Sequence, residues 1–242
     1  MKRFLTLLLA FVMIAAAFGV AMPASRTVSA QDAPEGIFYG TWPYKPLPDH
    51  NLNGFAANGL GDNLGVIFRQ MVEMPSAFYL VATNEYQPLL AESWGFTEDN
   101  TAYELKLIAD ATWSNGTPVT ADDVLATYAI GRIMGWTQFN YISEVQKIDD
   151  KTVHFVFSGE PSYLAERLIL KEYIVSAETY GDLAARATEL FDSGAASDSE
   201  EWIAFQTEIR EFRPDQLLAT GPYVYTLDDV SDSYMTLHWH PN

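Results

Sequence analysis

The sequence predicts a mixed α/β fold, and three stretches lead to this prediction. Residues 103–107 alternate apolar and polar side chains, which is typical of a half-buried strand. Residues 121–128 instead repeat apolar side chains at the spacing of one helical face. Residues 145–157 contain two apolar stretches around a polar turn at 149–151, and they therefore predict a hairpin. Strands and helices thus occur together in one chain.

A strand, a turn-rich stretch, a helix and a second strand are predicted before these three stretches. Residues 37–42 read as a short first strand, and the residues from 43 to 60 predict turns because they are rich in proline, asparagine and glycine. Residues 62–71 carry apolar side chains at i, i+3, i+4 and i+7, which predicts a helix that Pro75 closes. Residues 78–81 are predicted as a strand.

Local turn and cap signals lie between residues 115 and 135. Asn115-Gly116 is the dipeptide that most readily takes positive φ at both central positions of a tight hairpin turn. Thr120 and Asp123 have the spacing of a capping box, so a helix is predicted to begin there. We expect that helix to end at Gly131 or Gly135.

The last third of the chain predicts three helices and two strands. A helix opens at residues 161–164, and two more are predicted within residues 183–210. Ser197, with Glu200 three residues later, predicts the N-cap of the last helix. Its apolar face consists of Trp202, Phe205 and Ile209. Strands are predicted at residues 223–225 and 235–239.

The first 30 residues have the pattern of an export signal. Lys2 and Arg3 form a basic start, residues 4–22 are apolar, and Ser29-Ala30 ends a small-x-small cleavage site. The alternative is a single membrane anchor, since the apolar run could just span a bilayer. We favour cleavage near Ala30, so that the mature chain starts at Gln31 in an extracytoplasmic location.

Composition restricts the kinds of partner. Loss of the signal removes three basic residues and changes the net charge from −18 to −21. A chain this acidic repels phosphate backbones and anionic lipid, so nucleic acid is not an expected partner. The chain has no cysteine, which excludes a disulfide framework in an exported protein.

Four motifs in order resemble the extracellular solute-binding proteins of family 5, the peptide, nickel and oligosaccharide receptors of ABC importers. They are LAESW at 90–94, WSNGTPVTADDV at 113–124, the hairpin at 142–155, and ATGPY at 219–223, in which Ala219 replaces the usual glycine. Each motif alone is mostly turn chemistry, and the match rests on their order and spacing. The resemblance further implies a strand and turn at 174–178.

The resemblance implies a type II periplasmic-binding-protein-like architecture that is incomplete. The segments 31–75 and 161–242 are expected to build lobe I, with 180–213 as a helical elaboration. Residues 76–160 are expected to form an inserted subdomain. Family members are much longer, so we expect an N-terminal fragment in which the second lobe is missing.

The function that the resemblance implies is capture of a solute without catalysis. A cleft that closes between the lobes would take up a peptide or, alternatively, an oligosaccharide and deliver it to an ABC permease. The receptor is expected to be a monomer in the periplasm or secreted. Without the second lobe, these 242 residues are expected to bind solute weakly or not at all.

Aromatic side chains are the candidate ligand contacts, because rings bury much area at little entropic cost. Tyr39 and Trp42 end the first predicted strand, and Phe139 and Tyr141 lie where related receptors bring an aromatic residue near the ligand. The alternative for each ring is a place in the core. We assign three tryptophans to the core: Trp94, Trp113 and Trp202.

Other functions have less support in the sequence. A secreted glycan hydrolase is the enzymatic alternative, but no nucleophile elbow, cysteine or HExxH motif is present, and carboxylate pairs occur by chance among 32 acidic residues. His238 and His240 are spaced to share a strand face, yet two imidazoles make an incomplete metal site. We therefore expect no enzyme activity, metal or cofactor. An adhesion module would show internal repeats, and no period of 20–50 residues occurs.

Overall fold

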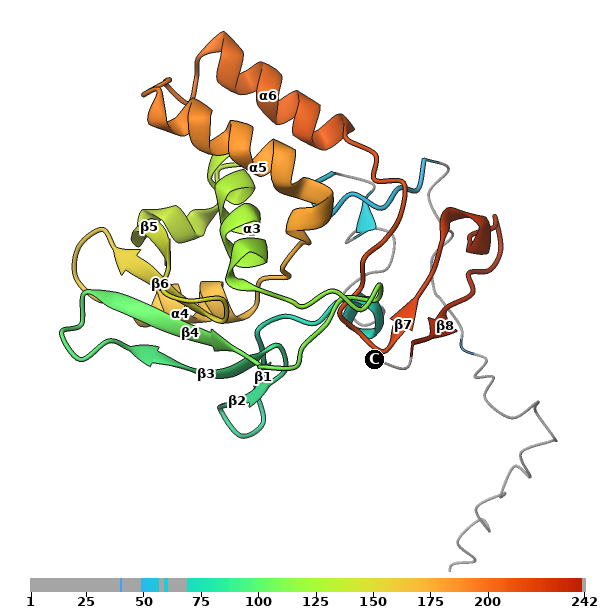
Figure 1. The fold of residues 1–242 in the computed structure, drawn as a ribbon, viewed down its shortest axis with the longest axis horizontal. Coiled ribbons are helices and arrows are strands. Elements are labelled where there is room, and N and C mark those ends of the chain that lie inside the picture. The colour runs from blue at the N-terminus through green and yellow to red at the C-terminus, as the bar shows by residue number, and fades with distance from the viewer. Residues whose placement is uncertain (1–39, 41–48, 57–58, 61–68, 241–242) are drawn as a thin grey trace, which may run out of the picture. The chain divides into compact units, whose positions relative to one another are not determined.

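The computed structural model describes most of the chain, and the structural statements below concern these residues: 40, 49–56, 59–60 and 69–240. The chain divides into two compact units, 1–43 and 44–242. Every described helix and strand lies in the second unit (Figure 1).

Several predicted elements fall outside the described residues. These are the export signal, the strand at 37–42 apart from Gly40, and most of the helix at 62–71. From residue 69 that helix is described, and it continues to residue 72. No helix among the described residues is long and apolar enough to cross a membrane.

The described elements include both strands and helices, in short runs of each. In chain order they are β1 (Ala77–Leu80), β2 (Glu85–Pro88), β3 (Ala91–Phe96), β4 (Ala102–Leu107), α3 (Ala121–Ile133), the 3₁₀ turn η1 (Thr137–Asn140), β5 (Ile142–Lys147), β6 (Thr152–Phe157), α4 (Tyr163–Leu170), α5 (Ala177–Asp192), α6 (Glu200–Glu211), β7 (Tyr223–Val224), the 3₁₀ turn η2 (Leu227–Asp229) and β8 (His238–Trp239). The predicted mixed α/β class is thus confirmed.

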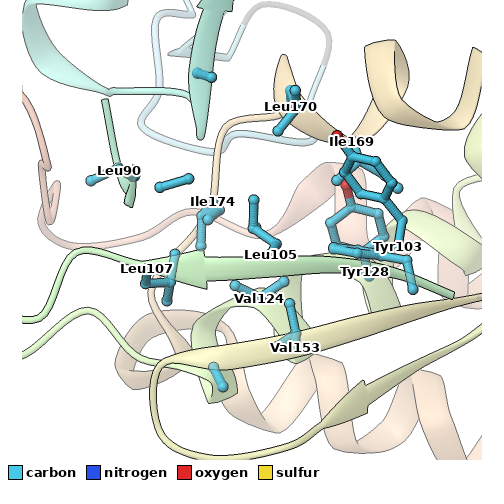
Figure 2. Packing of buried hydrophobic residues seen from close by; sticks show 14 of the residues in the cluster. Leu90, Tyr103, Leu105, Leu107, Val124, Tyr128, Val153, Ile169, Leu170 and Ile174 are labelled. Carbon is cyan, nitrogen blue, oxygen red and sulfur yellow. The ribbon is translucent and has the colours of Figure 1, made fainter. Parts of the chain in front are cut away.

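The largest of the described sheets is four-stranded and antiparallel, in the order β3-β4-β6-β5. The strand predicted at 103–107 and the hairpin predicted at 145–157 are both present, as β4 and as β5 with β6. Along β4 the side chains of Tyr103, Leu105 and Leu107 are buried, while those between them are exposed. Leu105 pairs with Val153 of β6, and the two point into the same core. Figure 2 shows this apolar face.

Helices α3 and α4 cover the apolar face of the sheet. Val124 and Tyr128 of α3, with Ile169 and Leu170 of α4, belong to the same buried cluster as the strand residues (Figure 2). The opposite face carries cross-strand polar pairs, such as the one between Glu104 and His154. The sheet therefore has one buried and one solvated side, as antiparallel sheets commonly do.

Helix α3 begins and ends where its local chemistry predicts. The Thr120 N–H donates to the Asp123 carboxylate at 2.7 Å, which forms the predicted capping box. Gly135 follows the helix with φ of +74°, a conformation that glycine adopts without strain. Gly131 lies within the helix. Glycine suits this position because the Trp136 ring packs against it, and a Cβ atom would lie 2.4 Å from that ring.

The turn at Asn115-Gly116 differs from the expected hairpin. Only Gly116 has a positive φ, of +83°, and the Trp113 N–H donates to the Thr117 carbonyl at 2.8 Å. This is the pattern of a longer loop with glycine at its left-handed position. Asn115 instead uses its side-chain oxygen to accept from the Thr117 N–H, so its own φ stays negative.

Helices α5 and α6 are the two helices predicted within residues 183–210, although α5 begins earlier, at Ala177, and both pack on α3 (Figure 1). Trp202, Phe205 and Ile209 are buried as predicted, and the Trp202 indole donates to the Ile133 carbonyl at 3.1 Å. The strand expected at 174–178 is absent from the described residues. Ser176 is the N-cap of α5 instead, because its hydroxyl accepts the Glu178 N–H.

The N-cap of α6 is Ser199 rather than the predicted Ser197. The Ser199 hydroxyl accepts the Trp202 N–H at 3.3 Å, so the helix starts two residues later than the capping pattern indicated. Changing Ser199 to alanine is expected to lower the free energy of unfolding by about 1 kcal/mol. Ser197→Ala is the matched control and should have almost no effect in urea denaturation. Equal effects of the two variants would contradict this cap.

Candidate functional site

The ATGPY motif joins three parts of the chain. The Gly221 and Thr220 N–H groups both donate to the Val72 carbonyl, at 2.8 and 3.2 Å, and the Thr220 hydroxyl accepts the Met74 N–H at 2.9 Å. One residue earlier, Ala219 exchanges two hydrogen bonds with Ser114 of the WSNG turn. The motif therefore holds the end of the 69–72 helix beside the 113–117 turn.

Asp123 connects the same turn to the start of α5. Its buried carboxylate accepts from the Trp113 indole at 3.2 Å, from the Thr120 N–H at 2.7 Å and from the Ala177 N–H at 2.7 Å. Burial raises the pKa of Asp123, and these donors oppose that rise. Two of the motifs, WSNGTPVTADDV and ATGPY, thus form structural joints, as expected for Asp at a helix start.

A buried polar cluster, here called the polar junction, lies where the three predicted segments of the fold meet. Arg69 and Glu73 come from the first segment, Gln138 from the inserted subdomain, and Glu172 and Tyr173 from the return segment. Arg69 Nε lies 2.5 Å from Glu73 Oε2, and its guanidinium carbon lies 4.0 Å from the centroid of the Tyr173 ring. The Glu73 side chain is only 5% exposed. Burial on this scale makes the ion pair sensitive to loss of either partner.

Glu172 extends the polar junction to the 3₁₀ turn η1. Burial raises the pKa of Glu172, while Lys171, Arg69 and a hydrogen bond with the Gln138 side chain act in the opposite direction. Gln138 is itself buried within η1 and immediately precedes Phe139. One of the predicted ligand contacts therefore adjoins the polar junction.

The raised pKa of Glu172 gives a prediction about pH. Because the folded state holds the Glu172 proton more tightly than the unfolded state, stability should decrease as pH rises from the ordinary value of 4.5 through the folded pKa. Glu172→Gln should remove this decrease and be more stable than the parent at pH 7. Urea denaturation between pH 4 and 7 measures the slope of stability against pH for the parent and for the variant. A parent slope that the variant retains would assign the decrease to other groups.

Asn53 is a connecting residue that no sequence pattern distinguishes from the other turn residues. Its buried amide donates to the Ile209 and Phe212 carbonyls at 2.7 and 3.0 Å, and its oxygen accepts the Phe55 N–H at 2.8 Å. These bonds tie residues 51–55 to the end of α6. The partners lie more than 150 residues away, so no local pattern could reveal them.

The structure describes two of the four predicted ligand contacts. Phe139 is partly buried, with the Arg132 guanidinium 4.4 Å from its ring centroid and the Tyr128 ring at 6.3 Å. Tyr141 is also partly buried and packs against the main core. Tyr39 and Trp42 lie outside the described residues. Phe139 and Tyr141 thus lie close together around η1, each with part of its surface exposed.

The structure also shows where the tryptophans and histidines that were considered in the sequence lie. Trp113 is buried as expected, whereas Trp94 is only half-buried at the margin of the core. His238 is exposed and pairs with Asp229 at 2.7 Å, and the His240 N–H donates to the Pro222 carbonyl. Within the described ranges no three His, Cys, Asp or Glu residues are grouped as metal ligands.

Solved structures define the class of this fold. A periplasmic oligopeptide-binding protein from Thermotoga maritima matches with a TM-score of 0.54 and 22% identity, covering 72% of this chain and 28% of that chain. Its mannohexaose-bound structure matches with a TM-score of 0.52, over 74% of this chain and 30% of that chain. The fold is therefore that of the periplasmic binding proteins.

The family follows from the sequence comparison. The model of the bacterial extracellular solute-binding proteins, family 5, matches residues 85–242, and the chain belongs to this family. A Brucella melitensis protein named as a binding protein is 30% identical over 104 residues, which is 39% of this chain and 17% of that protein. A periplasmic alpha-galactoside-binding protein of Rhizobium meliloti is 32% identical over 90 residues, or 33% and 13% of the two chains. The chain thus spans less than a third of the length of these relatives.

Proposed function

We propose that this chain is part of an extracytoplasmic receptor that captures a solute and delivers it to an ABC permease. The observation that carries the proposal is family membership over residues 85–242. The one buried carboxylate of the described family motifs, that of Asp123, is used in a helix cap and a joint, which is a structural role. In this proposal the receptor is a monomer, and its signal is removed near Ala30.

The solute is proposed to be an oligopeptide. The second candidate is an oligosaccharide, favoured by the alpha-galactoside-binding relative and by the mannohexaose-bound structure of similar fold. Four aromatic side chains are proposed to line the cleft: Tyr39, Trp42, Phe139 and Tyr141. For Phe139 and Tyr141, the supporting observation is that each residue is only partly buried beside η1.

The same proposal assigns lobe I to the segments 31–75 and 161–242, and the inserted subdomain to residues 76–160. In this assignment the polar junction ties the segments together, because its five residues come from all three of them. A receptor that closes on its solute needs lobes of fixed internal shape, and buried polar contacts that cross segment boundaries supply such rigidity.

Calorimetric titration tests the proposed function. The protein from the complete reading frame is expected to bind either an oligopeptide mixture or mannohexaose, and to leave the bound solute chemically unchanged by mass spectrometry. The 242-residue chain alone should bind weakly or not at all. Tyr141→Ala in the complete protein should weaken binding, while Trp239→Ala, at an exposed strand end, should not. Micromolar binding by the 242-residue chain, or cleavage of the solute, would overturn the proposal.

A further inference from the structure

A groove of about 300 Å³ lies between α5 and α6, away from the polar junction and η1. Its lining residues are Leu183, Ala204, Thr207, Glu208, Glu211 and Phe212. Leu183 is buried and Phe212 half-buried, so they supply apolar surface, while the α6 residues are exposed and include two carboxylates. The groove is therefore apolar at its base and acidic at its rim.

Beside this groove α6 already binds a cation from the same chain. The Arg186 guanidinium pairs with the Glu208 carboxylate through both terminal nitrogens, with Nη2 to Oε2 at 2.6 Å. The guanidinium carbon also lies 4.7 Å from the centroid of the Phe205 ring. A carboxylate and an aromatic ring on this helix thus together accept a guanidinium, as ion pairing and cation–π attraction predict.

At the C-terminal end of α6 a second carboxylate and a second aromatic ring line the groove. Glu211 is the last residue of the helix and Phe212 is its C-cap, so the two are adjacent in sequence and do not repeat the spacing of Phe205 and Glu208. Glu211 makes no ion pair with any residue that the structure describes. The neighbouring arginines are engaged elsewhere: Arg210 contacts Gln206, and Arg213 donates to the Arg210 and Phe212 carbonyls.

Charge around the groove favours a basic occupant. Nine acidic and three basic residues lie from Ala177 to Arg213. Ile203, which precedes Ala204 of the lining, is 52% exposed and adds apolar surface beside the rim. A partner with the complementary pattern would carry arginine or lysine together with apolar side chains.

We propose that the groove is a docking site for a basic amphipathic segment of a partner protein, with one arginine or lysine side chain placed between Glu211 and Phe212. The volume suits one or two side chains, so the contact is weak and reversible. Because Glu211 is exposed, binding weakens as ionic strength rises. The proposal does not depend on the solute or on the proposed cleft.

A synthetic amphipathic peptide of leucine and arginine is the probe, and binding to the whole chain is followed by fluorescence anisotropy. Glu211→Gln is expected to weaken binding about threefold to tenfold, because of the two carboxylates that line the groove Glu211 is the one without an ion pair among the described residues. Ala204→Arg should abolish binding by placing a cation in the groove itself. Asp198→Asn, an equal charge change in the loop before α6, is the matched control and should change the affinity less than about twofold.

Four results would overturn the proposal. The first is that the arginine peptide does not bind, and the second is that a leucine and glutamate peptide binds equally well. The third is an equal loss in Glu211→Gln and Asp198→Asn, which would show general attraction to an acidic surface. The fourth is self-association of the chain through this groove, seen as a dimer that Ala204→Arg dissolves in sedimentation experiments. Circular dichroism of each variant confirms that an observed loss is not unfolding.

Discussion

Replacing Gly221 by alanine is expected to lower the free energy of unfolding by about 3 kcal/mol. A Cβ atom at this position would lie 2.5 Å from the Met71 carbonyl oxygen and 2.8 Å from the Val72 carbonyl carbon. Both are backbone atoms, so no side-chain rotation can relieve the contact. The backbone must separate, and the hydrogen bond from the Gly221 N–H to the Val72 carbonyl is then lost.

Urea denaturation followed by tryptophan fluorescence measures this effect, and Gly181→Ala is its control. Gly181 lies within α5, and an added Cβ atom would meet nothing within 4 Å. Alanine there should raise stability by about 0.5–1 kcal/mol, because glycine is the poorer helix former. Opposite signs for the two variants are therefore expected. A neutral Gly221→Ala would mean that the ATGPY joint is not closely packed.

Sequence patterns predicted the strands and helices with local periodicity, and failed where a tertiary contact decides the structure. The alternation in β4 and β6 placed Tyr103 and Val153 in the core correctly. The residues at 174–176 have strand-like composition, yet no strand of the described sheets pairs with them. Instead, the Val175 N–H donates to the Thr127 hydroxyl of α3 at 2.9 Å. Such a contact across 48 residues is invisible to a local pattern.

The candidate site was predictable only in part. The aromatic side chains of Phe139 and Tyr141 were predicted as ligand contacts, and both residues lie around η1 with some exposed surface. The polar junction gave no sequence signal, because Arg69, Glu73 and Glu172 resemble other charged residues of the chain. Their importance follows from burial and from convergence of three chain segments. An i, i+4 arginine–glutamate pair is ordinary on a helix surface, and only tertiary packing makes this one buried.

Changing Asp123 to alanine is expected to lower the free energy of unfolding by about 3–4 kcal/mol. The variant would leave the Trp113 indole and the Thr120 and Ala177 N–H groups without their acceptor in a buried setting. It would also remove the capping box of α3. Since one carboxylate joins the WSNG turn, α3 and α5, the loss should also reduce cooperativity between these parts.

The neighbouring Asp122 provides the matched control for Asp123. Asp122 is exposed and pairs with Lys147 at 2.9 Å, so Asp122→Ala should cost less than about 1 kcal/mol. Asp123→Asn keeps one oxygen but turns an N–H group toward donors, so its effect should approach that of alanine. Urea denaturation and amide hydrogen exchange measure the three variants. If Asp122→Ala destabilised as much as Asp123→Ala, general charge near the start of α3 would explain both effects. If Asp123→Ala alone raised exchange at both Thr120 and Ala177, the shared carboxylate would be the joint between the two helix starts.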